Sequence, residues 1–454
     1  MAIRTVFRGA VLPTAWYNVV PDLPFKLPPP VNARTGFPVG PHDLAQVIPH
    51  ELLEQELGAE QREVRIPREV RDLYRTWRPT PLVRAKMLEE ALGTPARLYY
   101  KYEGTSPTGS YEANTAIPQA YYAGRARAKK LVSGAGDGEW ATSLAMATNK
   151  FGLVAKVYVV QASLARRPRL KTLAELWNAQ VVPSPSTETR TGRQALAADP
   201  EAPGSLGLAM SEALEEAMTD KDAKYATGTL LTSVILHQTV IGLEARRQME
   251  HIGELPDVII GAVGGGSGFG GLIAPFLPLR LDGRPIRFVA AEPAAVPSLT
   301  RGTYAYDYPD AVGLLPLLKM YTLGHNYAGP TIHAGSMRYH GMSPLVSALY
   351  DNGLVEAVAV GQVPALGSAI QFARTESVLA APDVAYCLHV VVAEAMRCKE
   401  TGEAKTILFA VNTHGQSNLS TYEAYLSELI QDIHPDEAGI QRSLQDLPVP
   451  GTAP

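Results

Sequence analysis

The sequence has few of the features that mark secreted, membrane or nucleic-acid-binding proteins. It contains 2 cysteines in 454 residues, which excludes a disulfide framework. No apolar run approaches the roughly 18 residues that a membrane-spanning helix needs, and the short apolar stretch before Pro13 is too broken for a secretory leader. The net charge is −4, so no large basic field exists to hold nucleic acid. We therefore expect a cytoplasmic protein that acts on a small-molecule substrate, with no nucleic acid, membrane or metal as a partner.

Hydrophobic residues make up 46% of the chain, which is ample for a buried core. Short apolar runs alternate with longer helix-like segments, a pattern typical of an α/β protein with a mostly parallel sheet and helices on both faces. The runs that predict strands are Arg97–Tyr102, Lys130–Ser133, Ala155–Val160, Asp257–Val263, Ile286–Ala291 and Thr406–Val411. The segments that predict helices are Glu139–Lys150, Leu170–Asn178, Leu206–Met218, Thr232–Met249 and Pro364–Thr375.

The two cysteines, Cys387 and Cys398, have helical spacing, because eleven residues correspond to about three turns. We expect both thiols on one buried helical face rather than in a disulfide. Near the start of the chain, prolines cluster between Pro21 and Pro30, which predicts an extended arm packed on the surface.

Two Gly-rich turns that follow predicted strands are the strongest local signals. The more informative of the two turns is Gly261–Gly271, with the sequence GAVGGGSGFGG. Consecutive glycines let the backbone approach a ligand and direct several N–H groups at one anion. A tightly packed structural turn is the competing interpretation, and the sequence fits neither a dinucleotide fingerprint nor a Walker loop. The candidate anion-binding residues are Gly264, Gly265, Gly266, Ser267 and Gly268.

The second turn, Ser133–Trp140, opens a predicted helix and carries Asp137 and Glu139. Acidic side chains at a helix start are stabilising in their own right, so self-capping is one interpretation. The other is a binding loop in which these carboxyls would repel a carboxylate ligand and attract an amine. A third stretch, Tyr100–Asn114, predicts a strand, a turn and then a helix capped by Ser110. Two Gly-rich turns of this kind favour two α/β units with a cleft at the carboxyl ends of their strands.

These stretches, in this order, resemble the second class of tryptophan synthase β chains, which carry an N-terminal extension. The most specific matches are WRPTPL at 77–82, YYKYEG at 99–104, HQTVIGLE at 237–244, LLKMYTLGH at 317–325 and MRYHGM at 337–342. The resemblance implies the type II fold of enzymes that use pyridoxal phosphate (PLP), with two three-layer α/β domains, a cleft between them and a homodimer. It implies an N-terminal extension over residues 1–75, a smaller domain over 111–235 and a larger domain over 76–110 and 236–454.

The chain departs from this family's pattern at the cleft. Where the family has the lysine that holds PLP covalently, this chain has Glu112, and the family's catalytic glutamate falls on Gly134. The family's serine near the pyridine nitrogen aligns with Asn412, and an asparagine of the phosphate loop with Gly268. The acidic residue of the Arg-Thr-Glu stretch is retained as Glu376. These replacements are all expected in one cleft, whereas the family motifs outside it are retained. This distribution favours selection for a different chemistry at the site.

From the replaced lysine we predict a PLP-independent enzyme of secondary metabolism that carries out a cyclisation, isomerisation or addition–elimination on a small metabolite. Without an amine at position 112, we expect no covalently bound cofactor and PLP only in noncovalent form. A buried carboxyl such as Glu112 has a raised pKa, which suits proton transfer near neutral pH. The predicted catalytic residues are Glu112, Tyr111, Glu376 and Asp137, and the predicted substrate-binding residues are Ser110, Asn114, Gly136, Gly138, Glu139 and Asn412.

Two alternatives stay open. The chain could carry out PLP-dependent β-replacement, as a tryptophan-synthase-like lyase, with PLP bound noncovalently or attached to another lysine such as Lys101 or Lys171. It could also be a noncatalytic subunit that binds or regulates a partner. The sequence does not name the substrate.

Overall fold

The computed structural model describes residues 4–5, 12–58 and 60–452. The stretch before Pro13, on which the prediction about a secretory leader rests, lies mostly outside these residues. In the described part of the chain, no helix is both long and apolar enough to span a membrane.

The larger of two main sheets has seven strands in the order β1-β4-β5-β15-β10-β11-β14. The five strands from β5 to β14 run parallel, and β4 and β1 add an antiparallel edge. In this order the strands are Arg4–Thr5, Leu82–Arg84, Arg97–Tyr102, Thr406–Val411, Val258–Ala262, Arg287–Pro293 and Glu356–Val360.

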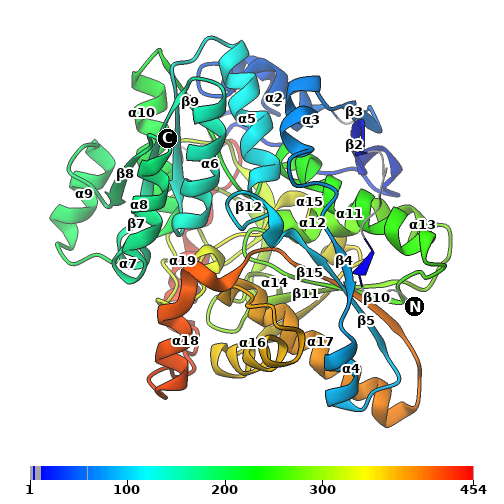
Figure 1. Cartoon of the computed structure of the whole chain (residues 1–454). Helices are drawn as coiled ribbons and strands as arrows, with labels where there is room; N and C mark the ends of the chain where they lie inside the picture. Colours follow the sequence, from blue (N-terminus) through cyan, green and yellow to red (C-terminus); the bar gives the residue numbers. More distant parts are fainter. Residues whose placement is uncertain (1–3, 6–11, 59, 453–454) are drawn as a thin grey trace.

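Helices cover both faces of the larger sheet (Figure 1). Alternate residues of a strand point to opposite faces, and accordingly Ile259 and Leu408 pack with α11 and α12, whereas Ile260 and Phe409 pack with α16 and α17. This part of the chain therefore has three layers. Its helices are α4 (Lys86–Leu92), α11 (Thr232–His251), α12 (Ser267–Ile273), α13 (Leu277–Leu281), α14 (Ser298–Arg301), α15 (Pro344–Asp351), α16 (Gln362–Glu376), α17 (Pro382–Thr401), α18 (Leu419–Leu426) and α19 (Glu437–Gln445).

The smaller sheet has four parallel strands in the order β8-β7-β6-β9, which are Gln180–Ser184, Val154–Val160, Lys130–Ala135 and Ala223–Tyr225. Leu131 and Val157 face α5, α6 and α8, whereas Val132 and Tyr158 face α10, so this sheet is also the middle of three layers. Its helices are α5 (Ala113–Arg125), α6 (Gly138–Lys150), α7 (Gln161–Arg166), α8 (Pro168–Leu176), α9 (Arg190–Ala198) and α10 (Leu206–Thr219).

The N-terminal residues form an arm that packs against α11 and α5. Its short elements are β2 (Ala15–Tyr17), β3 (Glu63–Arg65), α1 (Pro41–Leu44), α2 (His50–Leu57) and α3 (Arg68–Tyr74). Between Pro21 and Pro30 the chain has no strand or α-helix, and most of its side chains are partly exposed, as the proline cluster predicts. A separate two-stranded antiparallel sheet, β12 (Thr303–Asp307) with β13 (Leu318–Thr322), packs against α14 and α15.

The fold class predicted from the sequence is confirmed, and every predicted strand and helix is present with shifts of a few residues at its ends. Cys387 and Cys398 are free, buried and on α17, as expected. One local prediction is wrong: Ser110 does not cap the following helix. That helix, α5, begins at Ala113, and Glu112 occupies the N-cap position. The domain boundaries stay a prediction.

Candidate active-site cleft

A small cavity of about 70 Å³ lies where the carboxyl ends of strands from both sheets meet. The end of β6 contributes Gly134 and Ala135, the end of β10 contributes Ala262, and Asn412 follows β15. This is the position at which α/β folds bind ligands. The sequence-predicted residues that line the cavity are Tyr111, Glu112, Gly136, Asp137, Gly264, Gly265, Gly266, Ser267, Gly268 and Asn412.

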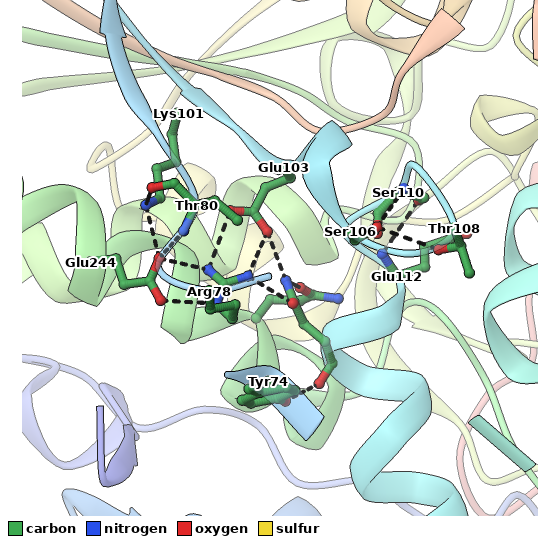
Figure 2. Close-up of polar contacts among 12 residues, drawn as sticks. Tyr74, Arg78, Thr80, Lys101, Glu103, Ser106, Thr108, Ser110, Glu112 and Glu244 are labelled. Carbon is green, nitrogen blue, oxygen red and sulfur yellow. Dashed lines mark hydrogen bonds and ion pairs between the residues drawn. The ribbon is translucent and has the colours of Figure 1, made fainter. Parts of the chain in front are cut away.

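The loop that carries Glu112 is fixed by hydrogen bonds to its own backbone and to β15. Ser106 Oγ donates to the carbonyl oxygen of Ser110 (2.6 Å) and accepts from Ser110 N–H (2.9 Å), and these residues lie beside Glu112 in Figure 2. The N–H of Tyr111 donates to the carbonyl oxygen of Asn412 at 2.9 Å. The loop therefore presents the Glu112 side chain to the cavity from a well-supported backbone.

Beneath this loop lies a buried ion network of two cations and two anions. Arg78 donates to Glu103 (Nη1–Oε2, 2.7 Å) and to Glu244 (Nε–Oε1, 2.9 Å), and Lys101 Nζ donates to Glu244 Oε2 (2.9 Å). Figure 2 shows Arg78 between the two carboxylates. Asn114, the residue after the first position of α5, also accepts from Arg78, at 2.8 Å. The network balances its charges and ties β5, α11 and α5 together.

The glycine loop after β10 has no room for side chains where it faces the cavity. A Cβ on Gly265 would lie 2.0 Å from Thr229 Oγ1, and one on Gly264 would lie 2.8 Å from the Cα of Met337. Gly266 has φ of +89°, in the left-handed region that favours glycine. Ser267 Oγ lies 3.3 Å from the Tyr111 hydroxyl. The loop is therefore a backbone-lined cradle for a ligand group.

On the opposite side, the turn between β6 and α6 is acidic and is held by an arginine. Arg167 donates to Asp137 (Nη2–Oδ2, 3.0 Å) and to Glu139 (Nη1–Oε1, 2.7 Å). Asp137 also accepts from the N–H of Glu139 at 3.3 Å and from that of Ser336 at 2.8 Å. The self-capping interpretation of this turn is confirmed. Arg167 pairs with both carboxyls, and the expectation that this pair attracts a substrate amine stays a prediction.

These contacts set the pKa values of the acidic turn. Burial works to raise the pKa of Asp137, but the charge of Arg167 outweighs it and holds that pKa below the ordinary aspartate value. Burial raises the pKa of Glu139 well above the ordinary value, because the charge of Arg167 offsets it only in part and the charge of Asp137 adds to it. Arg167 forms ion pairs with both carboxyls of this turn.

Glu112 and Asp383 are the carboxyls of the cavity wall that form no ion pair with a cationic side chain in the described part of the chain. Burial, followed by the charges of Asp137, Glu139 and Asp383, raises the pKa of Glu112 well above its ordinary value. Withdrawal from water, followed by the charge of Asp137, raises the pKa of Asp383 to about 7. The Oε2 atom of Glu112 and the Oδ1 atom of Asn412 are buried without a hydrogen-bond partner.

Five predicted site residues lie elsewhere. Glu376, at the end of α16, accepts from the N–H of Leu88 at 2.8 Å and is not on the cavity wall, so its prediction as a second cleft carboxyl is wrong. Helix α16 carries it toward α4, and Asp383 of α17 stands in the cleft instead. The other four support the wall from behind rather than line it: Ser110, Asn114, Gly138 and Glu139.

Neither lysine proposed as an alternative attachment point reaches the cavity. Lys101 is buried in the ion network, and Lys171 lies on α8, half exposed, 3.7 Å from Glu175.

Position 134 has no room for a side chain at all, because a Cβ there would lie 2.4 Å from the N atom of Met210 on α10.

Sequence reasoning missed Arg167 and Asp383, and also Thr229, which closes on the glycine loop. Asp383 had a usable signal, since an acidic residue directly after Pro382 is typical of the first turn of a helix. Arg167 and Thr229 had none, because only the fold brings them to the acidic turn and to the glycine loop.

The comparisons with known proteins agree with this fold. Residues 73–412 match the family model described as "Pyridoxal-phosphate dependent enzyme", which defines the class of the protein. The chain is 50% identical to "Tryptophan synthase beta chain 2" of Thermotoga maritima over 93% of its own length and 100% of that relative. It is 49% identical to the protein of the same name from Aquifex aeolicus, over 93% of this chain and 98% of the other. The chain belongs to the tryptophan synthase β chain family of PLP-dependent enzymes.

Solved structures share the fold at low sequence identity. A fungal L-serine ammonia-lyase from Rhizomucor miehei has a TM-score of 0.59 and 16% identity, covering 77% of this chain and 98% of the other. Maize serine racemase has a TM-score of 0.54 and 16% identity, covering 80% and 98%. These similarities support the type II PLP fold.

Family membership corrects two expectations drawn from the sequence. The prediction of a PLP-independent enzyme is wrong, and so is the prediction that no cofactor is held covalently, because the matched family is one of PLP-dependent enzymes. A single replacement at position 112 carries less weight than identity of about half over nearly the whole chain. The alternative that the sequence left open, PLP-dependent β-replacement, is better supported.

Proposed function

We propose that this protein is a PLP-dependent lyase of the β-replacement type that acts on an amino acid in biosynthesis. When bound, PLP supplies an electron sink for carbanion chemistry on amino acids. Support for the proposal comes from relatives named tryptophan synthase β chain, which the chain matches at 47–50% identity over more than nine-tenths of its length.

The observation that carries the proposal is the glycine cradle at the carboxyl end of β10. Gly264 and Gly265 line the cavity, and a Cβ on either would collide with Met337 or Thr229, so this part of the wall consists of backbone. Backbone N–H groups in such a loop suit a phosphate group. Asn412, with its unpartnered Oδ1, adjoins the cradle beside Gly268 and would face the ring. At this end, the residues present fit a phosphate-bearing ligand.

The other end of the cavity does not fit the attachment of PLP through a lysine. Within the described part of the chain, the cavity wall includes no lysine, and the loop that precedes α5 presents Glu112. A carboxylate cannot form the imine by which an amine holds an aldehyde. We therefore base the proposed function on the family and on the phosphate cradle, and not on the residues at this end.

Reconstitution of the purified protein with PLP tests the proposal. We expect one PLP per chain to be taken up, as measured by absorbance after desalting, and product formation from L-serine and a nucleophile such as indole to depend on added PLP. Reduction with borohydride followed by peptide mass spectrometry would identify any lysine that carries the cofactor. Absence of both PLP uptake and PLP-dependent turnover would contradict the proposed function.

A further inference from the structure

The cavity wall has an excess of hydrogen-bond acceptors and of negative charge. Its charged residues are Glu112, Asp137 and Asp383, and no lysine, arginine or histidine is among the lining residues in the described part of the chain. The two lining side-chain atoms that are buried without a partner, Glu112 Oε2 and Asn412 Oδ1, are both acceptors. Glu112 is only 9% exposed and Asn412 only 6%, so bulk water does not supply the missing hydrogen bonds to these two acceptors. A buried acceptor without a donor is costly, so a ligand that fits this wall brings N–H or O–H donors.

The negative charge of the cavity wall further restricts the class of ligand that can bind there. Asp137 already faces Arg167, with which it forms an ion pair at 3.0 Å. Among the described residues, neither Glu112 nor Asp383 forms an ion pair, and the nearby charge of Arg167 only partly offsets the burial of Asp383. The described residues also contain no group of three or more His, Cys, Asp or Glu arranged to hold a metal ion. A compact organic cation matches these two carboxyls better than a neutral donor does.

We propose that Glu112, Asp383 and Asn412 form a subsite for a primary ammonium group. An ammonium group has three N–H donors for the two unpartnered acceptors, and its positive charge suits two carboxyls that lack an ion pair. Asn412 lies against Gly268, so the subsite adjoins the glycine cradle. The cleft therefore suits a small ligand with a phosphate at one end and an amine at the other. The inference rests on the proposed function in so far as the test ligand carries the phosphorylated ring of vitamin B6.

Two ligands that differ in one group test the proposal directly. Pyridoxamine 5′-phosphate carries an ammonium group where pyridoxine 5′-phosphate carries a hydroxyl, and the ring and phosphate are the same. By isothermal titration calorimetry at pH 8 we expect the amine to bind the full-length protein about 10- to 100-fold more tightly, as for a hydrogen bond between charged groups. Glu112→Gln should reduce this preference to less than about 3-fold, and Asp383→Asn should reduce it in part. The affinity for pyridoxine 5′-phosphate should change little.

Glu90→Gln is the matched control, because it makes the same charge change at an exposed position on α4. It should keep the full preference for the amine. Equal affinity for the two ligands would overturn the ammonium subsite and leave the proposed function standing. A preference that survives in both Glu112→Gln and Asp383→Asn would also overturn it, since recognition would then lie elsewhere. If neither ligand binds, the inference and the proposed function both fail.

Discussion

Glu112 occupies the N-cap of α5 with a carboxyl group that is costly to ionise. Asp137 and Glu139 face it from the start of α6, Asp383 faces it from α17, and Ser110 is its neighbour on the same loop. Because its pKa is raised in the folded state, the folded protein binds this proton more tightly than the unfolded chain does. The free energy of unfolding therefore falls as pH rises from the ordinary glutamate pKa to the raised one.

Glu112→Gln removes this cost of ionisation. We expect the variant to gain about 1–3 kcal/mol of unfolding free energy at pH 8 and to change little at pH 4, where the carboxyl is protonated in both states. Urea denaturation of both proteins at the two pH values measures the difference. A gain of equal size at pH 4 and pH 8 would show that ionisation of Glu112 is not the cause.

Gly265 lies where the glycine cradle closes on Thr229. Gly265→Ala places a Cβ 2.0 Å from Thr229 Oγ1, so either the loop or Thr229 has to move. We expect a loss of about 1–3 kcal/mol of stability and at least about tenfold weaker binding of PLP, measured by urea denaturation and by titration. Gly124→Ala is the control, because its Cβ would meet only Phe151 Cβ, at 4.0 Å, inside α5. It should be neutral or stabilising by up to about 1 kcal/mol; comparable losses in both variants would contradict the steric account.

At the scale of elements, the Arg78 network decides how α5 and its preceding loop are held. Arg78 is fully buried and pairs with Glu103 from the end of β5 and with Glu244 from α11. Arg78→Met leaves the two carboxylates with Lys101 as the remaining cation, so we expect a loss of about 3–5 kcal/mol in chemical denaturation. Arg75→Met removes an exposed pair with Asp72 and should cost less than about 1 kcal/mol. Similar costs for the two variants would mean that the network does not stabilise this junction.

At the scale of the whole molecule, the cavity between the two sheets is small for a bound ligand. The cavity of about 70 Å³ is well below the roughly 300–1,000 Å³ of typical ligand sites. Since its wall comes from loops of both sheets, we expect PLP to increase hydrogen-exchange protection in both sheets at once, in peptides that span residues 134–140 and 264–269. Peptides from α9 (Arg190–Ala198), which lies outside the cavity wall, should not change. Protection confined to one of the two loops would contradict binding between the sheets.

The expected homodimer is a second prediction at this scale. Light scattering coupled to gel filtration should give close to twice the chain mass of 48.8 kDa. A monomeric mass would contradict the expectation from the family.

The sequence by itself determined most of the secondary structure, because the signals involved are local. Runs such as the one at residues 407–411 are apolar throughout, and a parallel strand covered on both faces requires that pattern. The glycine loop was also visible, since consecutive glycines disfavour the continuation of a strand and mark a loop. For the same reason, the spacing of Cys387 and Cys398 was enough to place both on one buried helix.

Only the tertiary structure decided which charged groups meet in the cleft. Arg167, Asp137 and Asp383 are far apart in the sequence, and the meeting of the two sheets brings them together around the cavity. The packing of α16 against α4 removed Glu376 from the cleft, although its local motif resembles that of a site residue. The sequence left Lys101 open as an attachment point for PLP, but the structure buries its side chain in an ion pair with Glu244 of α11. The pKa of a carboxyl and the availability of a lysine depend on neighbours and burial, and these are properties of the fold rather than of local sequence.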